Sequence, residues 1–454
     1  MWSLPNPDIL VFNSLEFIFL IFPVFFLIYA IVPRRFFLYV LLGGSLLLYG
    51  MAQPVYIGVL LAVLLINYVL ARLMGAFPAW RRLFLMLAVI SNFGILIYFK
   101  YFHLSGAMPL GISFYMFRIV GYEADVCGRK VKPERSLVRL GAFVAMFPTV
   151  TSGPITRYDQ MRAQLYKRRV SVIGLEEGLK TFVIGLGYKV LLADRIGILW
   201  NEIQIIGFES ISTPLAWMGA FAYSFMLYFD FQGYSLMAAG VGRMLGFTLP
   251  DNFNHPYSAR SFSQFWRRWH ISLSSWFRDY VYIPLGGNRK GLARTCLNLL
   301  IVWVATGIWH GNHWNFILWG VFTCFLLVLE RLFLKRPLEG SRFFSHIYMA
   351  LLVPVTWIVF AITDLKELAV YLTRLFPVWE LGGGVINPSD YIRYGRTFGI
   401  LFLACVVFSQ PWFARLYQKT KSSILWVPVL AAVFWICIYY LVNASSNPFL
   451  YFSF

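Results

Sequence analysis

The chain contains apolar runs that are as long as a lipid bilayer is thick. The first covers residues 9–32, where the only strongly polar side chains are Asn13, Ser14 and Glu16. A helix needs about 20 apolar residues to cross roughly 30 Å of hydrocarbon. This run lacks the basic leader and small-residue cleavage site of a secretory signal, so we expect it to be retained. With 59% hydrophobic and 13% charged residues, the chain is predicted to be an all-α polytopic membrane protein.

Further runs of this kind predict about eleven membrane crossings. Besides the first, clear spans are expected at 36–51, 55–71, 83–99, 215–241, 347–363, 398–413 and 424–442. The pieces 110–120 and 140–150 are too short to cross as straight helices, so we expect tilted or re-entrant segments. Irregular backbone at membrane depth needs a cover of protein or a water-filled cavity, which makes 109–195 a candidate channel lining.

The segments between the later spans are predicted to lie at the membrane surface. Residues 364–394 and 414–423 are expected to be surface loops with short interfacial helices. Residues 251–260 form a polar loop. The sequence shows no inverted repeat of the kind found in many transporters, and we expect one domain covering residues 1–454.

The basic residues indicate how the chain is oriented. The formal net charge is +19, but Lys and Arg form short clusters between apolar runs. This is the positive-inside pattern of membrane proteins and does not indicate a nucleic-acid-binding surface. The clusters assigned to the cytoplasm, where they would also meet anionic lipid, are Arg34 and Arg35, Arg81 and Arg82, 167–169, 289–294, and Lys335 and Arg336. Residues 1–7 carry no Lys or Arg and are expected outside.

Residues 295–329 are predicted to form a membrane hairpin. They include no Asp, Glu, Lys or Arg, and as one straight helix they would reach roughly 52 Å, well beyond one bilayer core. Both flanks are basic, so both ends are expected in the cytoplasm, and 297–334 is expected to hold two spans. The turn then falls at 309–313. This places His310 roughly 24 Å along a helix from Arg294, deep in the membrane or toward its outer half.

Two interpretations of His310 are open. An ionisable side chain at this depth predicts a functional role, because its burial must be offset by a partner or a use. Alternatively, His310 and His313 are polar residues at a helix turn that hydrogen-bond loose carbonyl groups. Gly307 and Gly311 bear on His310, since glycine lets another backbone or a ligand approach closely.

The aromatic and basic stretch 262–289 is the second candidate region. At helical spacing, one face is polar and carries Gln264, Arg268, Ser275 and Asp279. The apolar face carries His270 together with Trp266, Leu273 and Phe277. The arginines Arg267, Arg268 and Arg278 could hold the phosphates of a nucleotide-like donor, because guanidinium suits bidentate phosphate contact. The alternative is an amphipathic helix whose Trp and Arg side chains lie in the cytoplasmic interface.

Other ionisable residues are weaker candidates. Asp230 lies with Gln232 in the middle of the run 215–241, either in a direct role or paired with a buried Arg or a hydroxyl. A solvated or cavity-lining face of one amphipathic stretch is predicted for Glu177, Lys180, Lys189, Asp194 and Arg195. Loop or interface positions without chemistry are expected for His103, His255 and His346.

Several familiar motifs are missing from the sequence. It contains no Gly-x-Ser-x-Gly elbow, Walker loop or His-Glu-x-x-His motif. The cysteines are scattered singly, so no structural disulfide or metal site is expected from Cys127, Cys296, Cys324, Cys405 and Cys437. A histidine base inside a membrane cavity best suits acyl transfer, in which it removes the proton of a hydroxyl that attacks a thioester.

Several stretches have a more specific form. They are Pro109-Leu-Gly-Ile-Ser-Phe-Tyr115, Phe147-Pro148 with Ser152-Gly-Pro-Ile-Thr-Arg-Tyr158, Tyr228-Phe-Asp-Phe-Gln-Gly-Tyr-Ser235, Asn252-Phe-Asn-His-Pro-Tyr257, 265–289, Gly307-Ile-Trp-His-Gly311 and Asn447-Pro-Phe-Leu-Tyr-Phe-Ser-Phe454. With them the chain resembles the membrane-bound O-acyltransferase (MBOAT) family over essentially its whole length. The similarity is to the bacterial polysaccharide branch typified by alginate O-acetylation, with teichoic-acid D-alanylation proteins as more distant relatives. Gln232 and Leu236 depart from the usual Tyr-Phe-Asp-Phe-Ser-Gly-Tyr-Ser-Asp form.

The resemblance implies roles for two histidines. His310 of Trp-His-Gly would be the catalytic residue, and His270 of Arg-Arg-Trp-His the second functional histidine. The family fold implies a thin membrane core at which a cytoplasmic funnel meets an exterior one. Acetyl-CoA would enter from the cytoplasm, and the acetyl group would leave outside, usually to an exported SGNH-type partner that modifies a polysaccharide.

The leading hypothesis is therefore an O-acyltransferase of the bacterial plasma (inner) membrane that passes an acetyl group outward for polysaccharide O-acetylation. No bound cofactor is expected, and the donor is acetyl-CoA or an acyl carrier protein. The expected donor-binding or tunnel-lining residues are Arg267, Arg268, Trp269, Arg278, Asp279, Asn288, Trp309, Asp230 and Asn254. D-alanyl or other acyl transfer to a cell-wall polymer, a glycan or lipid transporter, and a scaffold for an exported enzyme are the alternatives. His310 and His270 are expected at two stations of one route, not as a contact pair.

Overall fold

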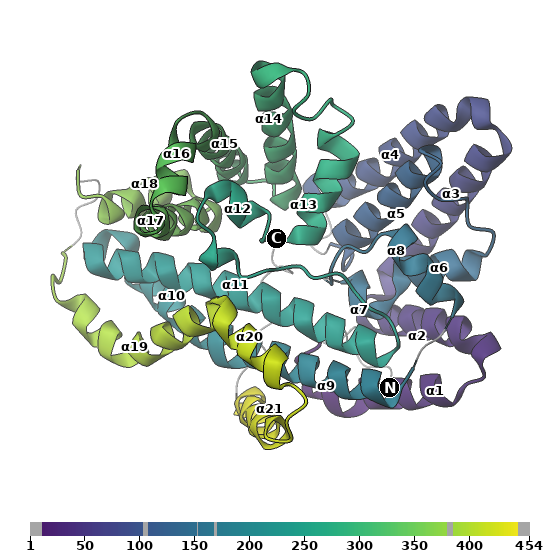
Figure 1. The fold of residues 1–454 in the computed structure, drawn as a ribbon, viewed down its shortest axis with the longest axis horizontal. Helices are drawn as coiled ribbons and strands as arrows, with labels where there is room; N and C mark the ends of the chain where they lie inside the picture. Colours follow the sequence, from purple (N-terminus) through teal and green to yellow (C-terminus); the bar gives the residue numbers. More distant parts are fainter. Residues whose placement is uncertain (1–10, 103–107, 152, 168–169, 379–384, 444–454) are drawn as a thin grey trace. The chain divides into compact units, whose positions relative to one another are not determined.

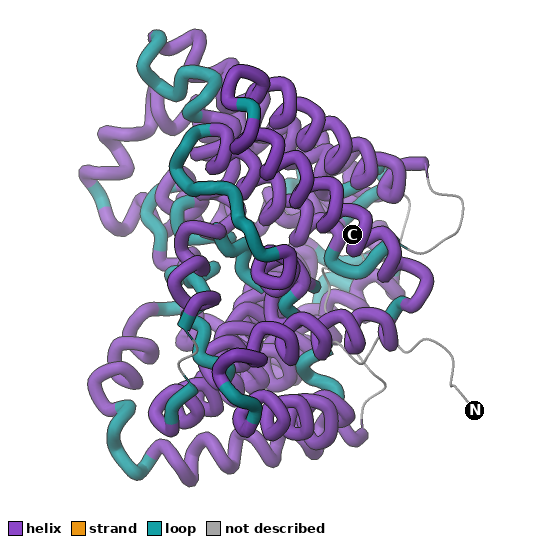
Figure 2. Tube along the Cα trace, turned by 90° about the vertical axis from the view of Figure 1, so that its right-hand side faces the viewer, coloured by secondary structure: helices purple, strands orange, loops and turns teal. Residues whose placement is uncertain are grey.

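The computed structural model describes residues 11–102, 108–151, 153–167, 170–378 and 385–443. Within these ranges the chain forms helices and connecting loops and no strand, as Figure 2 shows. The predicted all-α fold is confirmed. Several expectations fall outside the described residues, namely the exterior segment 1–7, His103, Arg168 and Arg169 of one basic cluster, and the motif 447–454.

Eight helices among the described residues are long and apolar enough to cross a membrane. They are Arg34–Ala52, Pro54–Ala76, Pro78–Phe102, Gly291–His310, Trp314–Gly340, Arg342–Ala361, Asp390–Ser409 and Trp426–Asn443. About eleven crossings were expected. The first predicted span gives a shorter apolar helix, Phe17–Ile31. The run 215–241 lies within helix α11 (Thr213–Met244), where polar residues are buried inside protein, so it is a core helix and not one of the eight.

The described residues form two compact units that alternate along the sequence. Unit 1 comprises residues up to 186, 233–251 and 430 onward, and unit 2 comprises 187–232 and 252–429. Helix α11 therefore contributes its first part to unit 2 and its second part to unit 1. The single domain expected from the sequence stays a prediction.

Unit 1 is built mainly from the first nine helices in Figure 1. These are α1 (Phe22–Ile31), α2 (Phe37–Ala52), α3 (Ile57–Ala76), α4 (Arg81–Ile97), α5 (Ile112–Cys127), α6 (Leu137–Ala145), α7 (Phe147–Val150), α8 (Tyr158–Tyr166) and α9 (Val172–Gly187), with most of α21 (Trp426–Asn443). The buried amides of Asn67 and Asn92 hydrogen-bond each other at 3.0 and 2.8 Å and join α3 to α4. Such polar pairs hold membrane helices together.

The predicted short segments of unit 1 are short in the structure. The run 110–120 belongs to α5, and 140–150 is divided between α6 and α7. The entry to α5 is held by Gln53, whose side-chain oxygen accepts the Leu110 N–H at 2.6 Å. Gly111 has a φ of 67°, and a Cβ there would lie 1.9 Å from the Val150 carbonyl oxygen. Only glycine allows this close backbone approach.

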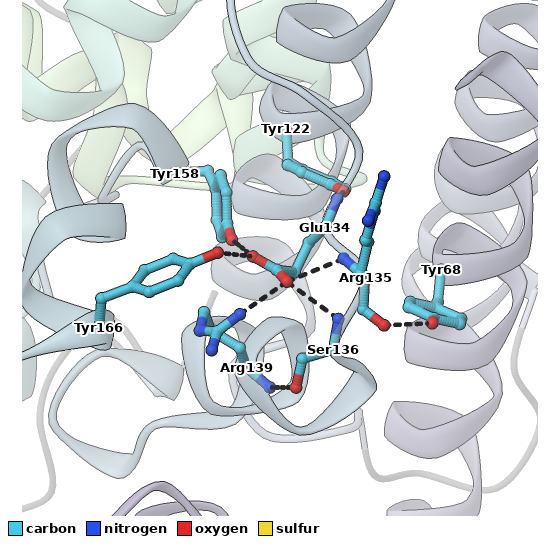
Figure 3. Close-up of polar contacts among 8 residues, drawn as sticks. All are labelled: Tyr68, Tyr122, Glu134, Arg135, Ser136, Arg139, Tyr158 and Tyr166. Carbon is cyan, nitrogen blue, oxygen red and sulfur yellow. Dashed lines mark hydrogen bonds and ion pairs between the residues drawn. The ribbon is translucent and has the colours of Figure 1, made fainter.

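A buried carboxylate holds the loop between α5 and α6 (Figure 3). Glu134 accepts hydrogen bonds from the backbone N–H groups of Arg135 and Ser136 at 2.8 and 2.9 Å and pairs with Arg139 at 2.8 Å. The Tyr158 hydroxyl donates to its other oxygen. This carboxylate thus orders the start of α6 from within unit 1.

Unit 2 contains the predicted hairpin and the aromatic–basic stretch. Its helices are α10 (Asp194–Ile206), α12 (Phe262–Trp266), α13 (Ile271–Phe277), α14 (Gly291–His310), α15 (Trp314–Leu329), α16 (Lys335–Gly340), α17 (Arg342–Ala361), α18 (Leu365–Leu375), α19 (Asp390–Ser409) and α20 (Pro411–Thr420). Short helices α18 and α20 lie where interfacial ones were predicted. The expected span 398–413 instead begins at Asp390 and ends at Ser409, because Pro411 starts α20.

The hairpin of α14 and α15 turns at Gly311–His313, as predicted. Its helices approach so closely that a Cβ on Gly307 would lie 2.4 Å from the Phe316 carbonyl oxygen. A Cβ on Gly320 would lie 2.4 Å from the Trp303 carbonyl oxygen. Small residues permit this backbone contact between membrane helices. Glycine in this hairpin therefore serves helix packing.

Replacing Gly320 with Ala should push α14 and α15 apart. We expect Gly320→Ala to lower the free energy of unfolding by about 1–3 kcal/mol, as overpacking does. Thermal unfolding of the detergent-purified protein measures the effect. Gly399→Ala in α19 is the matched control, because no atom lies within 4 Å of the position that its new methyl group would take. Equal melting temperatures for both variants would contradict the close-contact interpretation.

Candidate active site

His310 is the last residue of α14 and is buried at the turn of the hairpin. It is 7% exposed, and its ring meets Trp319 of α15 and Phe360 of α17 edge to face, at centroid distances of 5.3 and 4.9 Å. The Asn315 side chain donates to the Phe360 carbonyl oxygen at 2.9 Å and ties α15 to the end of α17 at this level. His313, by contrast, is exposed. Of these two hairpin histidines, His310 is therefore the one in an enclosed aromatic setting.

The stretch around His270 is not the continuous helix that the spacing predicted. Helix α12 ends at Trp266, and α13 begins only at Ile271. His270 lies between them with a φ of 42°, in the left-handed region. The unbroken helix assumed over 262–279 is therefore wrong. The predicted faces still agree with burial, because His270, Leu273 and Phe277 are buried, whereas the polar-face residues Gln264, Arg268, Ser275 and Asp279 are not. His270 itself lies in the protein interior, because it is 4% exposed.

The break at His270 is held by the segment that follows α11. The Ile271 N–H donates to the Asn252 carbonyl oxygen at 2.8 Å, and the Asn254 N–H donates to the Arg268 carbonyl oxygen at 3.0 Å. The Asn252 side-chain oxygen lies 3.0 Å from His270 Nδ1. Left-handed backbone at a bulky residue costs free energy, and such strain persists only where surrounding contacts over-determine it.

The same contacts assign the proton of His270. The Asn252 side-chain oxygen is an acceptor that also receives the Ser272 hydroxyl at 2.7 Å, so His270 Nδ1 donates to it. The lone pair is then on Nε2. Burial lowers the pKa of His270 from 6.5 to about 3, because a charged imidazole is disfavoured in an apolar setting. His270 is therefore a neutral imidazole at physiological pH.

Tryptophan rings join the elements that carry the two histidines. The ring centroid of Trp266 of α12 lies 4.6 Å from that of Trp303 of α14, 5.6 Å from that of Trp319 of α15 and 5.8 Å from that of Trp357 of α17. Trp269, next to His270, lies 4.7 Å from Trp357. This cluster, which we call the tryptophan cluster, places α12 against all three long helices.

The two histidines lie at different parts of this aromatic region. His310 contacts Trp319 directly. The ring centroid of His270 lies 4.7 Å from that of Phe231 of α11. The Phe253 ring contacts both Phe231 and Trp269, at centroid distances of 5.1 and 5.0 Å. Of the remaining predicted residues, Trp309 and Trp269 are buried in the same region. The structure thus brings the histidine segments into one unit.

The predicted donor-binding polar residues have mixed placements. Those that are exposed are Arg267, Arg278, Asn288 and Asn254. Arg278 pairs with Asp279 at 2.6 Å. Arg268 is turned inward and donates to the Ser258 hydroxyl at 2.6 Å. Arg268 therefore stabilises the loop that contains Ser258, whereas Arg267 faces outward.

Asp230 has a partner of a different kind from the one expected. A buried Arg or a hydroxyl was predicted, but Lys189 lies 2.7 Å from Asp230 and 2.8 Å from Asp194. Lys189 is 2% exposed, so the predicted solvated face is wrong for this residue. The amphipathic pattern failed because η7 (Tyr188–Ala193) is a π-helical turn that redirects the side chains.

Some site residues were missed by sequence reasoning. Asn252 stood within a recognised motif, but the exposed Asn254 was chosen instead of it. Glu330 immediately follows the uncharged stretch 295–329, and its position as the first charged residue after that long apolar run was the available signal. The tryptophan cluster joins residues far apart in the sequence, so no local pattern revealed it.

Comparison with known proteins gives the family of the chain. The membrane-bound O-acyltransferase family model matches residues 133–369. The chain belongs to this family. It is an integral, multi-pass membrane protein and an O-acyltransferase.

Three relatives with named functions are similar to the chain. A probable alginate O-acetylase of Pseudomonas putida is 33% identical, and the match covers 98% of this chain and all of the relative. A peptidoglycan O-acetyltransferase of Helicobacter pylori is 28% identical over 98% of each chain. A teichoic acid D-alanyltransferase of Bacillus subtilis is 31% identical over 50% of this chain and 60% of its own length.

The neutral state of His270 predicts a pH dependence of stability. Its pKa is about 3 when folded and 6.5 ordinarily, so between these values the unfolded chain binds more protons and stability rises with pH. His270→Asn keeps an N–H donor for Asn252 and tolerates the left-handed backbone. Melting temperature should therefore fall more from pH 7.5 to pH 5 in wild type than in this variant. Parallel curves would refute the assignment.

Proposed function

We propose that the protein transfers an acetyl group from a cytoplasmic thioester, acetyl-CoA, to a hydroxyl on the outer side, for O-acetylation of an exported polysaccharide. The observation that carries this proposal is His310, buried among aromatic rings at the far end of a hairpin whose flanks are basic. Positive-inside orientation puts those flanks in the cytoplasm. The relatives named for alginate and peptidoglycan O-acetylation favour an acetyl group and a polysaccharide acceptor.

His310 acts as the general base in this proposal. Its ring takes the proton of the acceptor hydroxyl while that oxygen attacks the thioester carbonyl. The carbon–sulfur bond then breaks, and the leaving thiolate accepts a proton to give free CoA and an O-acetyl ester. The surrounding rings of Trp319 and Phe360 keep water away, which limits hydrolysis of the thioester.

His270 assists as a neutral imidazole. Its Nδ1–H is held by Asn252, so Nε2 presents a lone pair in a fixed direction. This group accepts a hydrogen bond along the route and carries no charge in its resting state. We propose His270 and His310 as two stations of one path, with the donor entering from the cytoplasm.

We propose that this protein lies in the bacterial inner membrane and that the acetyl group reaches its final acceptor through an exported SGNH-type partner. Acyl transfer from a carrier protein is the second candidate, favoured by the similarity to a teichoic acid D-alanyltransferase. Reconstituted protein offered labelled acetyl-CoA or an acetylated carrier protein separates the two donors. A transporter would move its substrate without consuming either thioester.

Removing the His310 base should abolish most turnover. We expect His310→Asn to reduce thioester consumption about 100- to 10,000-fold, the usual contribution of a general base. The assay is release of free thiol from acetyl-CoA by protein in lipid nanodiscs. His346→Asn is the control, because His346 is exposed at the start of α17. Unchanged turnover in His310→Asn would overturn its role.

The two adjacent arginines should respond differently to mutation. Arg267 is exposed, whereas Arg268 is bonded to the Ser258 hydroxyl. We expect Arg267→Ala to raise KM for acetyl-CoA about fivefold to tenfold with little change in kcat, as loss of a charged phosphate contact does. Arg268→Ala should instead lower the melting temperature. An unchanged KM in Arg267→Ala would remove Arg267 from the donor site.

A further inference from the structure

Glu330 is a carboxylate buried inside a membrane-spanning helix. It follows α15 directly, in the π-helical turn η11 (Glu330–Leu334), and belongs to the span Trp314–Gly340. It is only 5% exposed. A carboxylate in such a place is costly unless hydrogen bonds replace its water. No step of the proposed reaction uses it.

Its partners are backbone groups of the short helix that precedes His270. Glu330 accepts the Phe262 N–H with one oxygen and the Ser263 N–H with the other, the latter at 3.0 Å. The Ser261 hydroxyl accepts the Gln264 N–H at 3.1 Å. The first three N–H groups of α12 thus have acceptors, and two of these acceptors are atoms of a residue in another helix. The positive end of the helix also favours the negative charge.

Helix α12 cannot hold its position alone. It has five residues, far fewer than the 12–15 or so that an isolated helix needs in water. Glu330 holds its first residues, and Trp266 packs in the tryptophan cluster at its last, beside ring contacts of Phe265 with Tyr257 and Trp357. The contacts of Glu330 and Trp266 both reach α15, since Glu330 follows that helix and Trp319 belongs to it. Helix α12 is therefore held along α15 at both ends.

The two ends of α15 bear on different histidines. Trp319, near its beginning, touches both Trp266 and His310. Glu330, at its end, holds the start of α12, which leads within a few residues to His270. A shift of α12 along α15 would therefore move Trp266 away from Trp319 and change the backbone that presents His270.

We propose that Glu330 is a positioning residue for the acyl-transfer reaction. By holding the first turn of α12, it keeps the His270 segment in register with the hairpin that carries His310. This inference deepens the proposed function and rests on it. Glu330 does not touch the reacting atoms, and its effect is on the placement of groups that do.

A purely structural role is the competing explanation, and Glu134 is the matched control. Glu134 is also buried, at 4% exposed, and also accepts two backbone N–H groups at the start of a helix (Figure 3). It has further bonds to Arg139 and Tyr158. Its loss should destabilise the protein at least as much as loss of Glu330, although it holds no segment that carries a candidate catalytic residue.

The experiment compares Glu330→Ala, Glu330→Gln and Glu134→Ala with wild type in lipid nanodiscs. Melting temperature, kcat and KM for acetyl-CoA are measured for each protein. We expect Glu330→Ala to lower kcat about 10- to 100-fold, since small misplacements of catalytic groups have effects of this size, with KM within about twofold. Glu330→Gln keeps one acceptor oxygen and loses the other, so its kcat should fall between those of wild type and Glu330→Ala. Glu134→Ala should lose melting temperature and keep kcat.

A second readout does not depend on turnover. Diethyl pyrocarbonate modifies neutral imidazole, and mass spectrometry reports the rate at His270, which should be slow in wild type because this residue is 4% exposed. We expect at least about fivefold faster modification in Glu330→Ala, because local opening exposes the segment, and no change in Glu134→Ala. If Glu330→Ala does not fold, the rate of His270 modification is measured in Glu330→Gln, where an increase over wild type is also expected.

The outcomes separate the two proposals. If wild type does not consume acetyl-CoA, the proposed function fails, and the modification rates still decide whether Glu330 holds the His270 segment. If Glu330→Ala loses melting temperature but keeps kcat, as is expected of Glu134→Ala, the positioning role is overturned. It is also overturned if His270 is modified at the wild-type rate in both Glu330 variants.

Discussion

The close backbone contact between α14 and α15 is the constraint on which the candidate site depends. Gly307 and Gly320 let each helix lie against a carbonyl oxygen of the other. A membrane gives no hydrophobic driving force between apolar helices, so such packing contacts supply the stability. The contact brings Trp303 and Trp319 together, and these rings receive Trp266. His310 is positioned because the hairpin has one tight geometry.

The second histidine is placed by polar contacts instead of by a helix. His270 lies in left-handed backbone between two short helices, and Asn252 binds both its ring and the following backbone N–H. The ring is thereby oriented, and burial keeps it neutral. A neutral histidine whose Nδ1–H is already bonded offers its Nε2 lone pair as a hydrogen-bond acceptor. The chemistry proposed for His270 follows from this local arrangement.

Local patterns predicted the parts of this protein whose structure is local. The membrane character, the hairpin and its turn near His310 followed from the length of apolar runs and the positions of basic residues. The unbroken helix assumed over 262–279 was wrong, because the chain breaks at His270, although the predicted apolar-face residues His270, Leu273 and Phe277 are buried. Lys189 was misplaced for a related reason, since a π-helical turn shifts side chains from their expected direction.

The sequence by itself determined the environment of the protein, its family, and the two histidines worth attention, because hydrophobic length and short motifs are properties of neighbouring residues. It did not determine which groups those histidines meet. Asn252, Glu330 and the tryptophan cluster act across distances of 18 to 91 residues along the chain. Such partners are decided only by tertiary packing, since a buried polar group takes whichever donor or acceptor the fold brings to it.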